Sequence, residues 1–242
     1  RRQFQLYRRM IVKGINKFHG YPAYILLQMI RDNNMQLQGI ESLDISLPSP
    51  SQAGTKRMKE YDLPLALLYL LPNVCDINFS NTAVPSHILF RFLEECPRLQ
   101  KVTWNHIPVA ANMEICGESL RSGKALREIN MDDSIFSTGF GGERSIGKKI
   151  ADLHNYPTLY LFHRCHSQVL VRVSIRNAKL AKVPQYALYG KKKVIWEGKR
   201  VSQNMLIKFI RNAPLNLNYF RSDLTPENRE MLKQEHDPRL IF

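Results

Sequence analysis

The sequence predicts an α/β solenoid of about six units, in which short parallel strands form one sheet and helices lie on its outer side. Two observations lead to this prediction. The first is an apolar spacing that recurs along the chain, and the second is an amphipathic helical pattern ahead of most of its copies. One such helix and strand bury little apolar surface alone, so these units are stable only when they stack.

The stretch CPRLQKVTW, residues 96–104, shows the recurring spacing most clearly. Its apolar residues Leu99, Val102 and Trp104 are separated by two variable residues and then by one. The copies of this spacing, of which the last is degenerate, begin at Ile40, Val74, Leu99, Leu126, Leu170 and Leu217. Because this pattern is typical of short buried strands, we expect strands centred near Leu43, Ile77, Val102, Ile129 and Val173.

The copies are unequally spaced along the chain. Their first positions are 34, 25, 27, 44 and 47 residues apart, and the two short steps match a repeat of about 20–29 residues with one strand and one helix. The longer steps contain insertions near residues 47–62, 137–149 and 181–200. The sequence therefore predicts one solenoid domain over residues 21–242 that tolerates three insertions.

Candidate helices precede four of the expected strands. Apolar residues recur every three or four positions in residues 21–34, 63–71, 85–96 and 202–213. Pro22 suits the first turn of a helix, while Ser86 and Ser202 suit helix N-caps. The proline of CPRLQKVTW then ends one helix and begins the chain segment that leads to the next strand.

These features together resemble the leucine-rich-repeat superfamily over most of residues 21–242. CPRLQKVTW is similar to the cysteine-containing subclass, in which Cys-Pro-x-Leu joins helix to strand. The ending NYFRSDLTPENREMLKQEH resembles an uncharacterised algal group of repeat proteins, and this resemblance implies the fold without an activity. Where the superfamily has Asn or Cys after the strand, this chain has Pro48, Thr82, Ile107, Ser134, Ala178 and Thr225, so whether the turns carry an asparagine ladder is left open.

Residues 1–20 are predicted to form a basic flanking helix. Phe4, Tyr7, Ile11 and Phe18 fall roughly on one face of such a helix. A retained targeting segment, or a helix that lies on a membrane surface, is the alternative. We expect no transmembrane segment, because no apolar run approaches the roughly 18 residues that a span needs.

The net charge of +14 over 242 residues is the one unusual bulk property. It favours acidic partners, namely nucleic acid, an anionic membrane or an acidic protein surface. The four cysteines are scattered without a CxxC pair, which argues against a disulfide framework and a structural zinc site. We therefore expect an intracellular protein, cytoplasmic or nuclear, and leave open organelle targeting by the basic N-terminus.

Two segments resemble parts of catalytic or ligand-binding motifs. GERSIGKK, residues 142–149, matches GxxxxGK but has Lys149 where a phosphate-binding loop needs Ser or Thr. HNYPTLYLFHRCH places His163, Cys165 and His166 close together, without the further ligands that a metal requires or the partners that a nucleophile requires. The sequence therefore predicts no enzyme, no cofactor and no metal site.

Polar residues alternate with the apolar ones along the expected strands, so they point to the face away from the core. If the units stack in register, the fifth and seventh positions form a polar ladder on a concave sheet. We predict a non-catalytic scaffold that recognises a protein or peptide, with an acidic one among the alternatives, through Asn78, Thr103, Asn105, Asn130, Asp132, Ser174, Arg176, Arg221 and Asp223. Arg176 and Arg221 are the expected anchors, because arginine is enriched at interface hot spots.

A nucleic-acid-associated protein is the alternative function. The run GKKKVIWEGKR sets basic residues beside a tryptophan, a combination that suits phosphate contact and base stacking. The residues concerned are Lys191, Lys192, Lys193, Lys199 and Arg200, together with the basic N-terminus. An exposed hairpin whose Val194 and Trp196 pack on the solenoid is the simpler interpretation of the same run.

Overall fold

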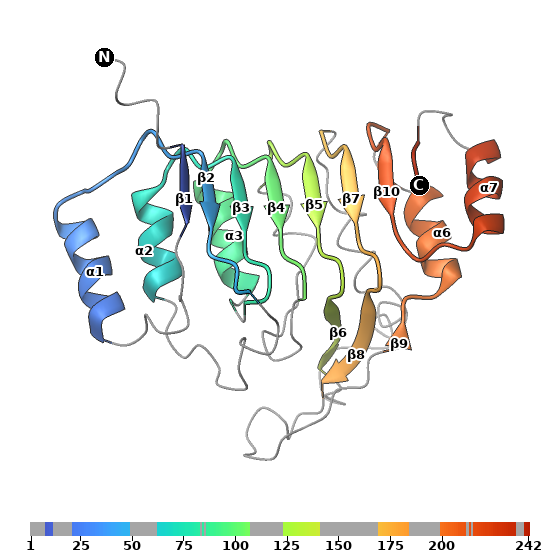
Figure 1. Cartoon of the computed structure of the whole chain (residues 1–242), viewed down its shortest axis with the longest axis horizontal. Coiled ribbons are helices and arrows are strands. Elements are labelled where there is room, and N and C mark those ends of the chain that lie inside the picture. The colour runs from blue at the N-terminus through green and yellow to red at the C-terminus, as the bar shows by residue number, and fades with distance from the viewer. Residues whose placement is uncertain are drawn as a thin grey trace, which may run out of the picture.

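Figure 1 shows the computed structural model of the chain, in which parallel strands stand side by side along the long axis. The structure describes residues 8–11, 21–48, 62–82, 84, 86–106, 123–140, 169–183, 199–211, 213, 215–235 and 240–242. The predicted insertions near 47–62, 137–149 and 181–200 lie mostly outside these residues.

The main sheet has seven strands, all parallel, and their spatial order follows the chain. The strands are β1 (Arg9–Ile11), β2 (Ser42–Asp44), β3 (Asp76–Asn78), β4 (Lys101–Thr103), β5 (Glu128–Asn130), β7 (Arg172–Ser174) and β10 (Tyr219–Arg221). The five predicted strand centres all lie in this one sheet, which confirms the repeat prediction. Two neighbouring parallel strands need a crossover connection between them. Successive strands of this sheet are therefore joined by segments much longer than the strands themselves.

The central residues of the strands form one buried column across the sheet. Leu43 pairs in register with Ile77, and the column continues through Val102, Ile129, Val173 and Phe220. Each of these six side chains is at most 2% exposed. The alternation that predicted the strands therefore also predicted which side chains face the core.

Helices precede three strands near the N-terminal side and flank the last strand at the other end. They are α1 (Tyr21–Asp32), α2 (Asp62–Leu70), α3 (Ser86–Glu95), α6 (Gln203–Arg211) and α7 (Pro226–Glu235). α3 passes behind β3 and β4, whereas α6 and α7 lie at the β10 end (Figure 1). The first four match the predicted helices, and the architecture is a leucine-rich-repeat-like α/β solenoid. Within the described residues, no helix has the length and apolarity to cross a membrane.

An aromatic cluster ties α3 to the sheet. The ring of Phe79 meets Phe92 of α3 at 5.5 Å and Trp104 at 5.9 Å between centroids, both edge to face. This geometry is favourable because the positive edge of one ring faces the negative face of another. Leu99, Val102 and Trp104 are each at most 1% exposed, as the phase of CPRLQKVTW predicts.

The N-terminal segment corrects one prediction. Arg9–Ile11 is strand β1, which pairs in parallel with β2, so these residues are not part of a helix over 1–20. The sheet consequently has seven strands where the repeat pattern predicts about six. Met10 packs against the core as a partly buried residue, and a single inward side chain is too short a signal for periodicity to detect.

A second, three-stranded sheet was not predicted from the sequence. It contains β6 (Ile135–Phe140), β8 (Lys179–Val183) and β9 (Lys199–Arg200), with β6 parallel to β8 and β8 antiparallel to β9. β6 follows β5 and β8 follows β7 (Figure 1), and the Lys179 N–H donates to the Ser134 carbonyl over 2.9 Å. The insertions predicted near 137–149 and 181–200 therefore begin in strands that extend two units of the solenoid.

Candidate functional site

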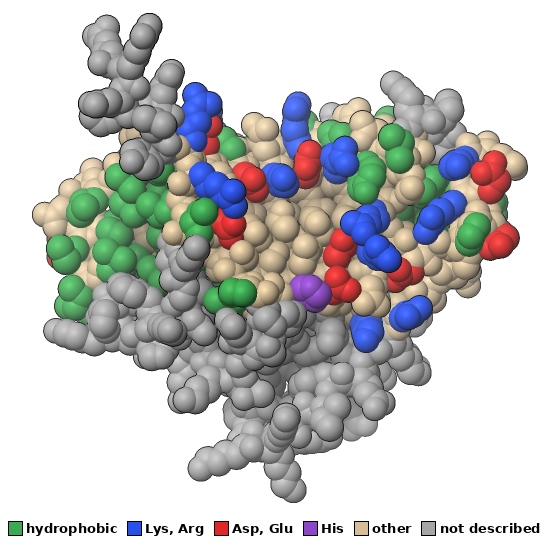
Figure 2. All heavy atoms as spheres, in the orientation of Figure 1, with side chains coloured by type: hydrophobic (Ala, Val, Ile, Leu, Met, Phe, Trp, Pro, Cys, Tyr) green, Lys and Arg blue, Asp and Glu red, His purple; other side chains and the backbone are tan. Residues whose placement is uncertain are grey.

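The candidate site is the open face of the main sheet, which we define as the side chains at the third and fifth positions of the units. These side chains flank the buried central residue of each strand and therefore point away from the core. Figure 2 shows acidic and basic side chains interleaved across this face. Sequence reasoning used the fifth position and missed the third, although the same alternation could have found Asp76, Lys101, Glu128, Arg172 and Tyr219.

A hollow of about 240 Å³ lies on the open face across β4, β5, β7 and β10. Thr103, Asn130, Ser174 and Arg221, all predicted site residues, line it together. Lys101, Glu128, Arg172 and Tyr219 complete its charged and aromatic walls. Of the other predicted residues, Asn78 lies on β3 beside the hollow, and Asn105, Asp132, Arg176 and Asp223 follow the strands at the seventh position.

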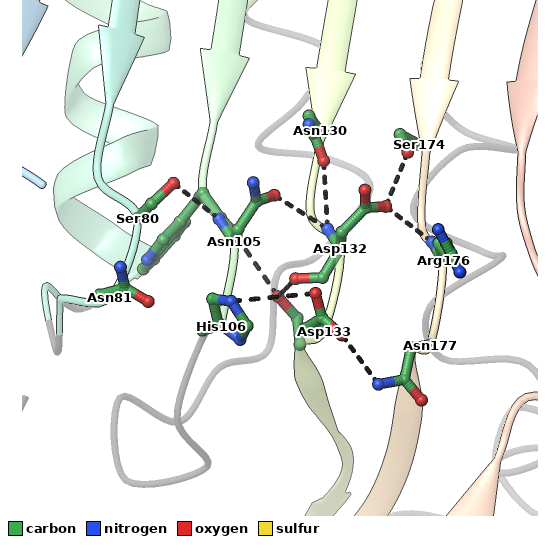
Figure 3. Close-up of polar contacts among 12 residues, drawn as sticks. Ser80, Asn81, Asn105, His106, Asn130, Asp132, Asp133, Ser174, Arg176 and Asn177 are labelled. Atoms are coloured by element: carbon green, nitrogen blue, oxygen red, sulfur yellow. Dashed lines mark hydrogen bonds and ion pairs between the residues drawn. The ribbon is translucent and has the colours of Figure 1, made fainter. Parts of the chain in front are cut away.

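The seventh-position side chains link successive units to one another (Figure 3). Asn105 Oδ1 accepts the N–H of Asp132 over 3.0 Å, and Asp132 Oδ1 accepts the N–H of Arg176 over 2.7 Å. One unit earlier, Ser80 Oγ accepts the N–H of Asn105 over 3.1 Å. Since buried amides need acceptors, this column stabilises the stacking of units as well as bordering the open face.

In four of the units, the residue after the seventh position turns the chain out of the strand. Asn81, His106, Asp133 and Asn177 have φ between 54° and 61°, the left-handed region that Asn and Asp tolerate best among residues with a side chain. Asn177 Nδ2 donates to Asp133 Oδ1 over 2.8 Å. The turns therefore do carry polar residues with left-handed backbone. These residues stand one position before the place where the leucine-rich-repeat resemblance leads one to expect Asn or Cys.

Asp132 is the most connected side chain of the site. It is 7% exposed, and its Oδ1 accepts the Ser174 hydroxyl over 2.6 Å in addition to the Arg176 N–H. Its Oδ2 lies 3.5 Å from Arg221 Nη1. Asp132 and Ser174 are therefore largely covered by their polar neighbours on this face, and the role that the structure gives them is to position the arginine beside them.

Three exposed arginines follow one another at the β7 and β10 end of the face: Arg172, Arg176 and Arg221. The guanidinium carbon of Arg172 lies 4.2 Å from the centroid of the Tyr219 ring, a contact that holds the planar group against the aromatic face. Among the described residues, no carboxylate lies within 4.0 Å of the Arg172 or Arg176 side chain. Their donors are therefore available to a ligand.

The β2 and β3 end of the open face is acidic. Burial alone would raise the pKa of Asp44, but hydrogen bonds from Ser46 and the contact with Arg9 bring that pKa below its ordinary value. Arg9 Nη2 donates to Asp44 Oδ2 over 2.6 Å. Burial raises the pKa of Asp76, and nearby Lys101 and Arg9 only partly oppose this. Asp44 and Asp76 thus lie at one end of the face and Arg172 and Arg221 at the other, with Lys101 and Glu128 between them.

The structure describes only some of the residues that were predicted to contact nucleic acid in the alternative function. Lys191, Lys192 and Lys193 lie outside the described residues, as do Val194 and Trp196. Lys199 and Arg200 form β9 at the edge of the second sheet, where Arg200 is exposed. The segments GERSIGKK and HNYPTLYLFHRCH also lie outside the described part of the chain.

Cys96 offers no activated nucleophile. Cys96 is buried, and burial raises the pKa of its thiol to about 12, so it stays protonated at neutral pH. Its Sγ lies 3.8 Å from the Leu71 carbonyl oxygen, where it packs between helix and strand. Within the described residues, no three His, Cys, Asp or Glu side chains are grouped as a metal site would require.

Comparisons with known proteins give a distant structural likeness. No protein-family model and no curated protein matches the sequence. Among solved structures, the chain is similar to the leucine-rich repeat-containing protein LegL7 from Legionella pneumophila, at 14% identity and a TM-score of 0.37. The match covers 88% of this chain and 53% of the other, so this chain spans about half the length of that protein. The fold assignment rests on the sheet topology, and nothing functional is drawn from a likeness this distant.

Proposed function

We propose that this chain is a non-catalytic scaffold that binds a protein or a peptide on the open face of its main sheet. The observation that supports this most is the hollow across β4, β5, β7 and β10. Side chains from four strands line it, and the parallel sheet holds those strands in fixed register. A surface built from several stacked units offers a partner more contact than any single unit could.

The side chains around the hollow are of kinds that suit recognition. Arg172, Arg221 and Tyr219 stand at one wall, and arginine and tyrosine are enriched among residues that dominate binding energy. Thr103 and Asn130, which are shorter and half-buried, border the middle of the hollow and leave it open. We therefore retain Thr103, Asn130, Arg176 and Arg221 as direct contacts and assign Asn105, Asp132 and Ser174 a supporting role.

A non-catalytic role in a reducing intracellular compartment is part of this proposal. The protonated, buried thiol of Cys96 supports the first point, and the free thiols of Cys75 and Cys96 support the second. The position of Cys96 between helix and strand also supports the resemblance of CPRLQKVTW to the cysteine-containing subclass of leucine-rich repeats.

The proposal is tested by capturing a partner and then blocking the hollow. The chain is immobilised, bound proteins are identified by mass spectrometry, and the affinity of each purified candidate is measured by calorimetry. Thr103→Arg combined with Asn130→Arg places two long side chains in the hollow. We expect this variant to lose the partner while remaining folded, because neither side chain belongs to the buried core. A thermal melt checks the fold, since Asn130 Oδ1 also accepts the Asp132 N–H over 3.2 Å.

Glu94→Arg provides the matched control. Glu94 is exposed on α3, on the outer side of the solenoid, and its substitution changes the net charge by the same amount as the pair in the hollow. We expect the control to bind like the wild-type chain. A partner that is lost with Glu94→Arg and kept by the double variant would place the interaction on the helices and contradict the proposal.

A further inference from the structure

The basic end of the open face specifies the chemistry of its partner. We propose that Arg172 and Arg221 jointly bind one carboxylate of an acidic segment in a partner protein. Tyr219 holds Arg172 in position, and Arg176 contacts a second acidic group of the same segment. This inference rests on the proposed function and adds the class of ligand and the residues that recognise it. Charge complementarity and the preset positions of the guanidinium groups carry the inference.

The two arginines are placed to act on one anion. Arg172 pairs with Tyr219 in the register of β7 and β10, while Arg221 pairs with Ser174. The arginines are thus diagonal neighbours on adjacent strands. With strands about 4.8 Å apart and about 3.3 Å per residue along each strand, their Cα atoms are separated by about 8 Å. Arginine side chains are long enough to converge on a single carboxylate over that distance.

Each guanidinium group is held in place before any ligand arrives. The guanidinium carbon of Arg172 lies over the Tyr219 ring, 4.2 Å from its centroid, and this contact restricts where the planar group can lie. Arg221 is held by Asp132 at 3.5 Å, and Asp132 is itself fixed by Ser174 and by the backbone of Arg176. Groups that are already ordered lose less entropy on binding, and a guanidinium fork matches a carboxylate in two parallel hydrogen bonds.

The rest of the face favours a peptide over a nucleic acid. A nucleic-acid strand carries a negative charge about every 3.4 Å, so a strand laid along the open face would pass Glu128, Asp76 and Asp44 as well as the arginines. Those carboxylates would repel its phosphates. A protein segment can set acidic side chains against β7 and β10 and neutral or basic ones against β2 and β3.

The test uses a short fluorescein-labelled oligoglutamate peptide, measured by fluorescence anisotropy at an ionic strength of about 0.15 M. The oligoglutamine peptide of equal length serves as the uncharged probe. We expect the wild-type chain to bind oligoglutamate only, and Arg172→Gln with Arg221→Gln to weaken binding at least about tenfold. Arg172→Lys keeps the charge and should still weaken binding, because lysine cannot provide the planar fork.

The matched control is Arg98→Gln with Lys124→Gln, which removes as much charge from exposed turns that precede β4 and β5. We expect it to bind oligoglutamate like the wild-type chain. Equal weakening by the two double variants would mean attraction by net charge alone and would overturn the proposal. A single-stranded oligonucleotide that binds more tightly than oligoglutamate through Arg172 and Arg221 would also overturn it, in favour of nucleic acid.

The outcomes separate this inference from the proposed function. If oligoglutamate fails to bind while a captured partner still depends on Thr103 and Asn130, the acidic-segment inference is wrong and the scaffold proposal stands. If the captured partner does not depend on Thr103 and Asn130, the scaffold proposal itself is wrong.

Discussion

The two ends of the open face differ in whether their charged side chains have a partner of opposite charge. At the β2 and β3 end, Asp44 accepts hydrogen bonds from Arg9 and Ser46, so its charge is balanced within the sheet. At the β7 and β10 end, Arg172 and Arg176 have no carboxylate within 4.0 Å among the described residues. An internally balanced charge stabilises the fold, whereas an available one can bind a partner. The comparison therefore assigns a structural role to Asp44 and recognition to Arg172 and Arg176, while Asp132 orients Arg221 at 3.5 Å.

The largest expected effect comes from the core that both ends share. Leu99 is 1% exposed, and Leu99→Ala should lower the free energy of unfolding by about 2–5 kcal/mol, as truncations in packed cores do. Urea unfolding measures the change. Lys101→Ala, two residues on and exposed on the open face, is the control and should change the stability by less than about 0.5 kcal/mol. Equal stabilities of the two variants would contradict the assigned phase of the strand.

Arg176→Ala should weaken binding of a captured partner by about 1–4 kcal/mol, the range of truncated hot-spot arginines. Its side chain is exposed, so the thermal melt should stay unchanged. Calorimetry measures the affinity. Substitutions in GERSIGKK should leave the affinity unchanged, and the reverse result would move the binding site from the open face to the insertions.

Asp132→Ala removes the acceptor shared by Ser174, Arg176 and Arg221. We expect the free energy of unfolding to fall by about 1–3 kcal/mol, because the buried Ser174 hydroxyl and the partly buried Arg176 amide lose their acceptor. Glu230→Ala, at an exposed position on α7, should stay within about 0.5 kcal/mol of the wild-type chain. If urea unfolding finds Asp132→Ala as stable as that control, the ladder of the seventh position contributes nothing to stacking.

The smallest effects concern the acidic end and depend on pH. The lowered pKa of Asp44 means that its carboxylate stabilises the fold above the ordinary pKa, and that this contribution is lost as the pH falls through the lowered value. The raised pKa of Asp76 has the opposite consequence: its charge opposes folding at neutral pH, and protonation relieves the penalty as the pH falls.

Two substitutions separate these carboxylates. In urea unfolding at about pH 7, Asp44→Asn should destabilise the chain and Asp76→Asn should stabilise it. The two differences should shrink as the pH falls and the carboxyls become protonated, first that of Asp76 and then that of Asp44. Differences of the same sign at neutral pH would contradict the contrast between the two residues.

Most of the solenoid could be predicted from the sequence, because its signal is local. The spacing around Val102 and its equivalents defines both a short strand and its buried side, and each copy adds weight to the others. β1 was missed because Arg9–Ile11 offers one inward side chain, Met10, inside a basic stretch. The second sheet was missed because β6 and β8 are far apart in the sequence. They pair because the main sheet places β5 beside β7, and β6 and β8 follow these two strands.

The candidate site could be predicted in position and only partly in role. Alternation correctly put Thr103 and Asn130 on the face away from the core. It could not show that Asp132 is covered by polar neighbours, since its partners Ser174 and Arg221 lie one and two units further along the chain. Nor could the alternation single out Arg172, because its guanidinium group is held by the ring of Tyr219 in the neighbouring strand.

The central claim is that the β7 and β10 end of the open face holds the partner and the β2 and β3 end does not. Charge reversal at each end tests it most directly, with the affinity of a captured partner measured by calorimetry for both variants. Arg172→Glu with Arg221→Glu should abolish binding, whereas Asp44→Lys with Asp76→Lys should retain it in the fraction that remains folded. Binding that survives reversal of the arginines and is lost on reversal of the aspartates would contradict the account.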